Sequence, residues 1–322
     1  MNDIANIVFP DQKYWETFFQ NGLGVSAFSS PAWQRLMEME ANDNCKVKFL
    51  LGKNSKGSDM HLPVVICKKK WKRTQIFAQP ISYFTTPVED SDVDEATVMS
   101  IVESATNLFT TKFLWSLPPW STWNPESHRK RTLSGILNVT KRMSYVITLN
   151  ESAEEYFSKN VHATIRRYTR QNIKRGLDVI TNPSIEQIQE YYELYSREFY
   201  EREWVGKKLS YQLFEKTASE LGDGGELVLM RHKDKIVGGG ILLYDKNAVH
   251  YFQGTIDRNA KEVRPMNALM YRALEQAETR GLKYFNLGGI NEANDGLAKF
   301  KSSWGAKMTS STLICWKSYL SI

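Results

Sequence analysis

Five cationic side chains lie close together near the middle of the chain: Arg166, Arg167, Arg170, Lys174 and Arg175. Spacings of three and four residues place side chains on one face of a helix. Guanidinium groups bind phosphate through paired N–H donors, so this face could hold the phosphates of a nucleotide diphosphate or of a lipid-linked acceptor. A face that is only solvated is the alternative interpretation.

Three residues could act as a general base towards an attacking amine. His250 lies in a strand-like segment, and the pKa of imidazole suits it to take a proton from an ammonium group. A structural histidine with satisfied nitrogens is the alternative. Glu292 and Asp295, next to a short predicted helix, compete for the same role. A reaction without a protein base, in which the substrate or a water takes the proton, also stays open.

The composition is that of a folded protein with two domains. Hydrophobic residues make up 42% of the 322 residues, and 15 Phe, 15 Tyr and 9 Trp can fill more than one core. No apolar run approaches the roughly 20 residues of a membrane span, and the N-terminus does not resemble a secretory signal. The three cysteines suit a reducing compartment and suggest no disulfide. We therefore expect a cytoplasmic protein with weak or no membrane contact.

Several classes of site have no support in the sequence. The five histidines are scattered, and no Cys/His cluster has the spacing of metal ligands, so we expect no metal. Neither a Walker loop nor a glycine-rich dinucleotide motif occurs. The net charge of +6 is patchy and accompanies no recognised nucleic-acid motif, which disfavours DNA as a partner.

The C-terminal half is predicted to have the order β-α-α-β-β-β-α-β-α-β after one leading helix over residues 150–174. Ser184 and Gln187 form a capping-box pair, and Pro265 suits the first position of a helix. Three consecutive glycines at 238–240 inside a strand indicate a bulge or a close approach of backbone. Strands are expected at residues 177–180, 226–231, 236–244, 248–256, 284–287 and 312–316, and further helices begin near residues 184, 210 and 295.

The N-terminal half repeats part of this order. A helix at residues 31–40, strands at 46–51, 61–67 and 74–79, a helix at 93–109 and a strand at 112–116 give α-β-β-β-α-β, which also occurs in the second half. We therefore predict an α+β protein with mixed sheets and two related domains, residues 1–140 and 141–322, of which the first is reduced.

Short motifs near the C-terminus are the most specific part of the sequence. They are Arg264-Pro265, Tyr284-Phe285-Asn286-Leu287-Gly288-Gly289, Gly296-Leu297 with Phe300-Lys301, and Trp304-Gly305. This series resembles the FemAB-like family of tandem-GNAT acyltransferases, which comprises peptidoglycan aminoacyltransferases and related sugar N-acyltransferases. The resemblance implies two GNAT-like domains in tandem. It also implies transfer of an acyl or aminoacyl group to an amine in the synthesis of cell-envelope glycans.

The resemblance also suggests roles for individual residues. Phe300 and Lys301 would face the acyl donor, and Lys301 would stabilise the negative charge of a tetrahedral intermediate or hold a donor phosphate. A solvated lysine on a basic helix is the alternative. Free N–H groups at the start of the Pro265 helix would bind the phosphates of the donor. Further residues expected at the donor are Arg264, Met266, Asn267, Tyr251, Gln253 and Asn286, and Arg35 is a candidate for an acceptor phosphate.

The sequence departs from the family pattern at the donor loop. GNAT pyrophosphate loops are normally glycine-rich, whereas residues 258–267 contain no glycine. The long helical arm of many tRNA-dependent members is also absent. Our leading hypothesis is transfer from acyl-coenzyme A, as co-substrate and without a permanently bound cofactor, to the amine of a nucleotide-linked amino sugar. The alternatives are an aminoacyl-tRNA-dependent transferase that builds peptidoglycan bridges, and a non-catalytic glycan-binding module.

Overall fold

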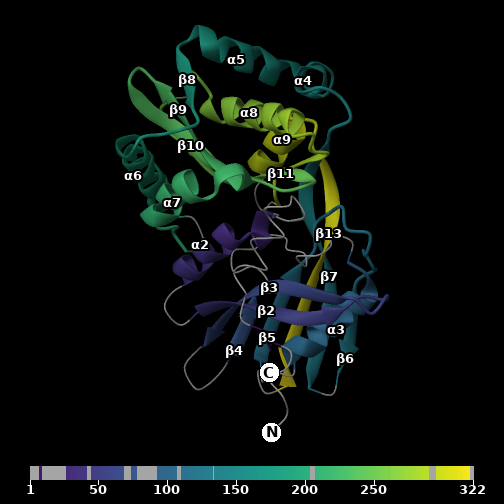
Figure 1. The fold of residues 1–322 in the computed structure, drawn as a ribbon. Coiled ribbons are helices and arrows are strands. Elements are labelled where there is room, and N and C mark those ends of the chain that lie inside the picture. The colour runs from purple at the N-terminus through teal and green to yellow at the C-terminus, as the bar shows by residue number, and fades with distance from the viewer. Residues whose placement is uncertain are drawn as a thin grey trace. The chain divides into compact units, whose positions relative to one another are not determined.

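The computed structural model of the protein describes residues 7–8, 27–41, 45–68, 74–77, 93–106, 110–132, 134–203, 207–260, 262–289 and 295–319. The chain forms two compact units (Figure 1): unit 1 contains Met1–Met143 and Thr309–Ile322, and unit 2 contains Ser144–Met308. The sequence-based boundary lay at residue 140 and left the last strand in the second domain. In the structure this strand, β13 (Lys307–Ser318), pairs with β5 (Thr110–Ser116), so residues 309–322 belong to unit 1.

Unit 1 is built on a mixed sheet. Its strand order is β1-β2-β3-β4-β5-β13-β7, with β6 paired to β7, and β4 and β5 form a parallel pair. The buried face of α3, including Val98 and Ile101, packs with Leu50 and Trp115 of the sheet in one core cluster. The bounds of these elements, and of α2, are β1 (Ile7–Val8), α2 (Pro31–Ala41), β2 (Cys45–Lys53), β3 (Asp59–Lys68), β4 (Thr74–Phe77), α3 (Glu95–Thr106), β6 (His128–Arg131) and β7 (Gly135–Thr148).

Two of the three cysteines are bonded to each other. Antiparallel pairing of β2 with β3 places Cys45 directly opposite Cys67, and their sulfurs form a disulfide. Cys315 is free. The expectation that no cysteines pair is therefore wrong. The two residues are 22 positions apart, and only the strand register brings them together.

From β8 to α9, unit 2 contains the predicted order β-α-α-β-β-β-α-β-α around a sheet with the order β7-β12-β11-β10-β9-β8. The last strand of the predicted order is β13, which belongs to unit 1. Strands β11 and β12 are parallel, and the other pairs are antiparallel. The elements are α4 (Ala153–Asn160), α5 (Ala163–Lys174), β8 (Leu177–Ile180), α6 (Ile185–Glu201), α7 (Tyr211–Glu220), β9 (Gly225–His232), β10 (Lys235–Tyr244), β11 (Ala248–Ile256), α8 (Pro265–Thr279), β12 (Tyr284–Asn286) and α9 (Asp295–Ser303). None of the described helices is long and apolar enough to cross a bilayer.

The leading helix predicted over residues 150–174 is divided into α4 and α5. Ser152 caps α4, and the chain turns to an extended conformation at Val161, whose side chain is buried in the core of unit 2. The next residue, His162, donates its backbone N–H to the carbonyl oxygen of Ser303 at 2.8 Å. The prediction of one helix is wrong here because burial and this long-range bond override the local helical pattern.

Glycines at the centre of β10 let two helices approach opposite faces of the sheet. A Cβ atom on Gly239 would lie 2.7 Å from Cε2 of Tyr191 in α6, and one on Gly240 would lie 2.6 Å from Cδ2 of Leu269 in α8. Successive strand residues point to opposite faces, so α6 and α8 cover different sides. The predicted close approach of backbone is confirmed, as is the capping box of Ser184 and Gln187.

Candidate active site

The two parallel strands of unit 2 separate at a defined point. Residues Ala248, Val249 and His250 of β11 pair with residues 284–286 of β12, and β12 then ends. Strand β11 continues to Ile256. Its register with β10 skips Phe252, which marks a β-bulge that bends the strand. Ligands of open α/β sheets bind beyond the carboxyl ends of such strands, so the segment after His250 is the candidate donor site.

His250 lies at the point of separation and is held on both sides of its ring. It is 1% exposed; its Nε2 lies 2.8 Å from Oδ2 of Asp245, and its Nδ1 lies 3.1 Å from Nδ2 of Asn286. An amide nitrogen only donates, so Nδ1 accepts, and the ring proton is on Nε2, facing Asp245. Both ring nitrogens therefore have protein partners.

A chain of hydrogen bonds continues from Asn286 to Lys301. The Oδ1 of Asn286 accepts the backbone N–H of Gly288 at 2.9 Å. The carbonyl oxygens of Gly288 and Gly289 accept from Nζ of Lys301 at 3.0 and 2.7 Å. Gly288 has a φ of 75°, a left-handed conformation that favours glycine. Residues predicted separately, His250, Asn286 and Lys301, thus belong to one network.

Lys301 is a buried cation on α9. Its side chain is 3% exposed, and burial lowers the pKa of its ammonium group to about 8. The ammonium also lies 5.9 Å from the centre of the Tyr145 ring, within the range of a cation–π contact. Phe300 is half-buried against the core of unit 2, whereas Asp295 is exposed at the start of α9. Glu292 lies outside the described residues.

The start of α8 follows β11 after a short connection. Arg264 adopts a left-handed conformation before Pro265, the first residue of the helix. Its guanidinium lies 4.1 Å from the centre of the Tyr168 ring, which belongs to α5. Asn267 is buried, and its amide nitrogen has no hydrogen-bond partner among the described residues. Met266 is half-buried, so the backbone at the helix start and Arg264 are what this segment offers to an anion.

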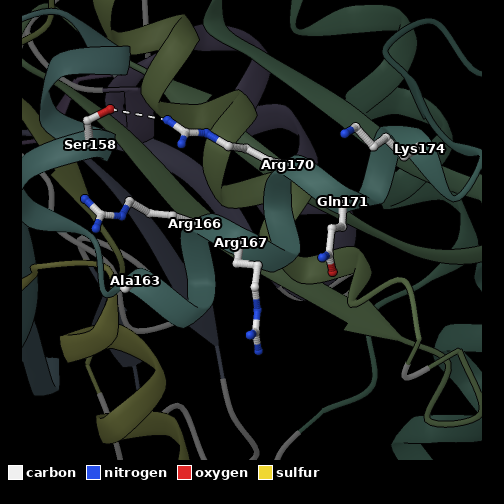
Figure 2. Close-up of a pocket in the computed structure, with 7 residues that line it drawn as sticks. All are labelled: Ser158, Ala163, Arg166, Arg167, Arg170, Gln171 and Lys174. Atoms are coloured by element: carbon white, nitrogen blue, oxygen red, sulfur yellow. Dashed lines mark hydrogen bonds between the residues drawn. The ribbon is translucent and has the colours of Figure 1, made fainter.

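The predicted basic face of α5 forms a pocket of about 520 Å³ (Figure 2). The Nη2 of Arg170 lies 2.8 Å from Oε1 of Glu154 and 3.5 Å from Oγ of Ser158. Figure 2 shows Arg170 directed towards Ser158, and Arg167 directed away from it. Arg175 does not line the pocket, since it donates to the carbonyl oxygen of Glu262. The lining residues are Ser158, Ala163, Arg166, Arg167, Arg170, Gln171 and Lys174.

Tyr168 connects this pocket with the start of α8, and sequence analysis did not identify it. The guanidinium of Arg167 lies 5.1 Å from the ring centre, on the same residue that Arg264 contacts. Hydrogen bonding to Arg167, together with the charge of Arg264, lowers the pKa of the Tyr168 hydroxyl. Only the packing of α5 beside α8 gathers these groups, because the two arginines are 97 positions apart in the numbering.

Two residues of β11 that were predicted at the donor have partners within unit 2. Gln253 accepts from the hydroxyl of Tyr191 at 3.1 Å and donates to Oγ1 of Thr255 at 2.9 Å. The ring of Tyr251 covers Gly254, where a Cβ atom would lie 2.5 Å from its hydroxyl oxygen. Arg35 is exposed on α2 in unit 1. The described residues contain no group of three or more metal-ligating side chains.

Comparisons with known proteins agree with this fold. Residues 159–302 match the acetyltransferase (GNAT) domain family. The crystal structure of FemX is similar, with 12% identity, coverage of 96% of both chains and a TM-score of 0.70. L-PGS from Bacillus licheniformis has 14% identity, coverage of 97% of this chain and 93% of its own, and a TM-score of 0.58.

A third similar structure is a tandem GNAT protein from the clavulanic acid biosynthesis pathway. It has 10% identity, covers 97% of this chain and 96% of its own, and has a TM-score of 0.52. No curated protein matches the sequence. The predicted fold class is confirmed by these likenesses, which at such identities concern the fold alone, and by the domain match.

Proposed function

We propose that this chain, an acyltransferase with a GNAT domain at residues 159–302 and the tandem fold of the similar structures, transfers an acyl group from a coenzyme A thioester to the amine of a nucleotide-linked amino sugar. The observation that carries the proposal is the separation of β11 from β12 beyond His250 and Asn286. A thioester that enters there meets backbone hydrogen-bonding groups on β11, and its phosphates reach the start of α8.

The donor site needs no glycine-rich loop. Backbone N–H groups at a helix start and the positive end of the helix dipole bind phosphate without a specific side chain. Arg264 adds a guanidinium at this position, and Arg167 contacts the same tyrosine as Arg264. Their positive charges complement a pyrophosphate, which supports coenzyme A as the donor despite the departure in sequence.

The transfer step forms an amide bond and breaks the thioester bond. The amine attacks the carbonyl carbon, and the resulting oxyanion needs a hydrogen-bond donor. Among the described residues, Lys301 uses two of its three N–H bonds on Gly288 and Gly289, which leaves one for the oxyanion. Coenzyme A then leaves as the thiolate and takes up the proton that the amine loses, so the step balances without a further acid or base.

The acceptor is proposed to bind through its phosphates to the pocket on α5. Arg166, Arg167 and Arg170 supply guanidinium groups for two phosphates of a nucleotide diphosphate. Arg170 is paired with Glu154, so most of the uncompensated charge of the pocket comes from Arg166, Arg167 and Lys174. Arg35 stays a second candidate for acceptor binding.

An aminoacyl-tRNA-dependent reaction is the second candidate function. The observation that favours it is the same pocket, because four cationic side chains on one helix also suit the phosphate backbone of RNA. Binding to RNA would depend steeply on salt, whereas binding of one nucleotide sugar would depend on it less.

Calorimetry and transfer assays with the full chain test the two donors against each other. Acetyl-coenzyme A and a set of longer acyl-coenzyme A thioesters are titrated first, and charged tRNA is compared in transfer assays with UDP-linked amino sugars. We expect micromolar binding of a coenzyme A thioester, a common level for enzyme substrates, and amide formation on the sugar. Transfer from charged tRNA without heat from coenzyme A would replace the proposal by the second candidate. No response to either donor would favour a non-catalytic module.

A further inference from the structure

We infer that Asp245, His250 and Asn286 form a buried lock that positions Lys301 through the backbone of Gly288. His250 in this arrangement is a positioning residue and does not act on the substrate. The inference rests on the proposed function for the role of Lys301 and adds the residues that hold it in place.

The lock begins at Asp245, whose two carboxylate oxygens have different partners. Oδ1 accepts the backbone N–H groups of Asn247 and Ala248 at 2.8 and 2.7 Å, in the turn between β10 and β11. Oδ2 accepts from Nε2 of His250 at 2.8 Å. The turn therefore fixes the carboxylate, and the carboxylate fixes the tautomer of the ring, as acidic groups beside histidine commonly do.

The tautomer determines the orientation of the next side chain. With its proton on Nε2, His250 offers only an acceptor at Nδ1, so the amide of Asn286 must present Nδ2 to it. The same orientation turns Oδ1 of Asn286 towards the N–H of Gly288. Each donor in the series thus meets an acceptor, from the turn at Asp245 to Gly288.

Gly288 connects Asn286 with Lys301 through its two backbone polar groups. Its N–H is held by Asn286, and its carbonyl oxygen accepts from the ammonium group and from the backbone N–H of Tyr145, both at 3.0 Å. A Cβ atom on Gly288 would lie 3.9 Å from Nζ of Lys301, so the backbone itself contacts the cation. A change in the peptide planes around Gly288 would therefore move or release the ammonium group.

A purely structural role for His250 is the competing explanation. Its neighbours on the two strands, Val249 and Phe285, are fully buried and apolar, and an apolar pair at 250 and 286 would fill the same space without buried polar groups. Buried polar networks are costly unless every member is satisfied. In this network each hydrogen-bond donor from Asp245 to Gly288 has its acceptor. The series of hydrogen bonds ends at Lys301, the one buried lysine in the described residues. Both observations favour a positioning role for His250.

Chemical labelling of Lys301 tests the lock without any assay of transfer. The full chain is treated with a limiting amount of an amine-reactive succinimidyl ester, and labelling of Lys301 is followed by mass spectrometry. His250→Gln keeps a group near Asp245 but loses the acceptor for Asn286, whereas His250→Asn keeps a group near Asn286. We expect labelling to rise about 10-fold in His250→Gln, the equivalent of one lost buried hydrogen bond, and to stay within about 3-fold of the wild type in His250→Asn.

His232→Gln is the matched control, because His232 is also buried in a strand of unit 2 and contacts the carbonyl oxygen of Gly176. We expect no change in Lys301 labelling there. A folded His250→Gln protein, judged by its melting curve, with wild-type labelling of Lys301 would overturn the inference. Since the labelling needs no substrate, an inactive wild-type enzyme would refute the proposed function alone.

Asp245→Asn provides a second test that changes almost no volume. In this variant the amide oxygen still accepts the N–H groups of the turn, so the amide nitrogen faces Nε2 of His250. An amide nitrogen can only donate, so Nε2 must accept and the ring proton moves to Nδ1. There it faces Nδ2 of Asn286, which is also a donor. In ¹⁵N NMR spectra of histidine-labelled protein, we expect the wild type to have its unprotonated nitrogen at Nδ1 and the variant to lose that state. Labelling of Lys301 should rise with it. An unprotonated Nε2 in the wild type, or unchanged Lys301 labelling in the folded variant, would contradict the lock.

Discussion

The ammonium group of Lys301 lies 2.7 Å from the carbonyl oxygen of Gly289 and 3.0 Å from that of Gly288. It is shielded from water, and these hydrogen bonds go to backbone dipoles rather than to a carboxylate. Such a cation keeps its charge close to the end of β12 and is not neutralised by an acidic partner among the described residues. Because Lys301 is both buried and without an acidic partner among the described residues, its replacement should change turnover and its titration should change stability.

Replacing Lys301 by Ala is expected to lower turnover about 100-fold, as the loss of one oxyanion donor does. The matched control is Lys299→Ala, because Lys299 is exposed on the same helix and its loss should leave turnover near the wild-type value. Steady-state kinetics with saturating donor, together with melting curves for both variants, check the prediction. A folded Lys301→Ala enzyme with normal turnover would remove Lys301 from the catalytic site.

Burial of Lys301 also predicts how stability changes with pH. Its pKa is about 8 in the folded protein, against an ordinary value of 10.5 for a solvated lysine, so between these values the unfolded chain binds more protons than the folded one. Stability rises with pH wherever the unfolded state binds more protons. We therefore expect the wild type to gain free energy of unfolding relative to Lys301→Met between about pH 8 and pH 10.5. Urea unfolding of both proteins at about pH 7.5 and about pH 9.5 measures this gain, and equal differences at both pH values would show that the lysine is not held in a lowered-pKa site.

The pocket on α5 should act on the phosphate-bearing acceptor and not on the donor. Reversal of charge in the double variant Arg166→Glu, Arg170→Glu is expected to raise the KM of the acceptor by about 10-fold or more, since charge-assisted hydrogen bonds to phosphate are among the strong ones. Arg175→Glu is the control, because Arg175 lies outside the pocket lining. Initial rates at several salt concentrations are measured with each substrate varied in turn. An unchanged acceptor KM in the double variant would show that the basic face of α5 is only solvated and does not bind the acceptor.

The donor phosphates are expected to bind near Arg264 at the start of α8. Arg264→Ala should weaken binding of coenzyme A about 10-fold through loss of a charge-assisted contact. Arg272→Ala, on the same helix but paired with Glu226, should bind coenzyme A as the wild type does. Calorimetry compares the three proteins. Equal coenzyme A affinities for Arg264→Ala and the wild type would show that the donor phosphates do not bind at Arg264. Asn267 is less suitable for such a test because it is buried, and a charge placed there would disturb the fold.

Features that depend on residues close together in the chain are predictable from the sequence alone. The basic face of α5 follows from spacings of three and four residues, and the start of α8 follows from Pro265 at its first position. The capping box at Ser184 needs only a partner three residues away. Because the partners in these interactions lie within one turn of a helix, their spacing in the sequence is enough to predict them.

Features whose partners are distant in the chain depend on the tertiary structure. His250 meets Asn286 across 36 positions, and Arg264 meets Tyr168 only because α5 packs beside α8. The break between α4 and α5 depends on the burial of Val161, and the pairing of Cys45 with Cys67 depends on strand register. Sequence identified His250 as a candidate base because the pKa of a free imidazole suits that role. Its position between Asp245 and Asn286 was not predictable, because hydrogen-bond partners across a sheet are set by register and packing rather than by residue type.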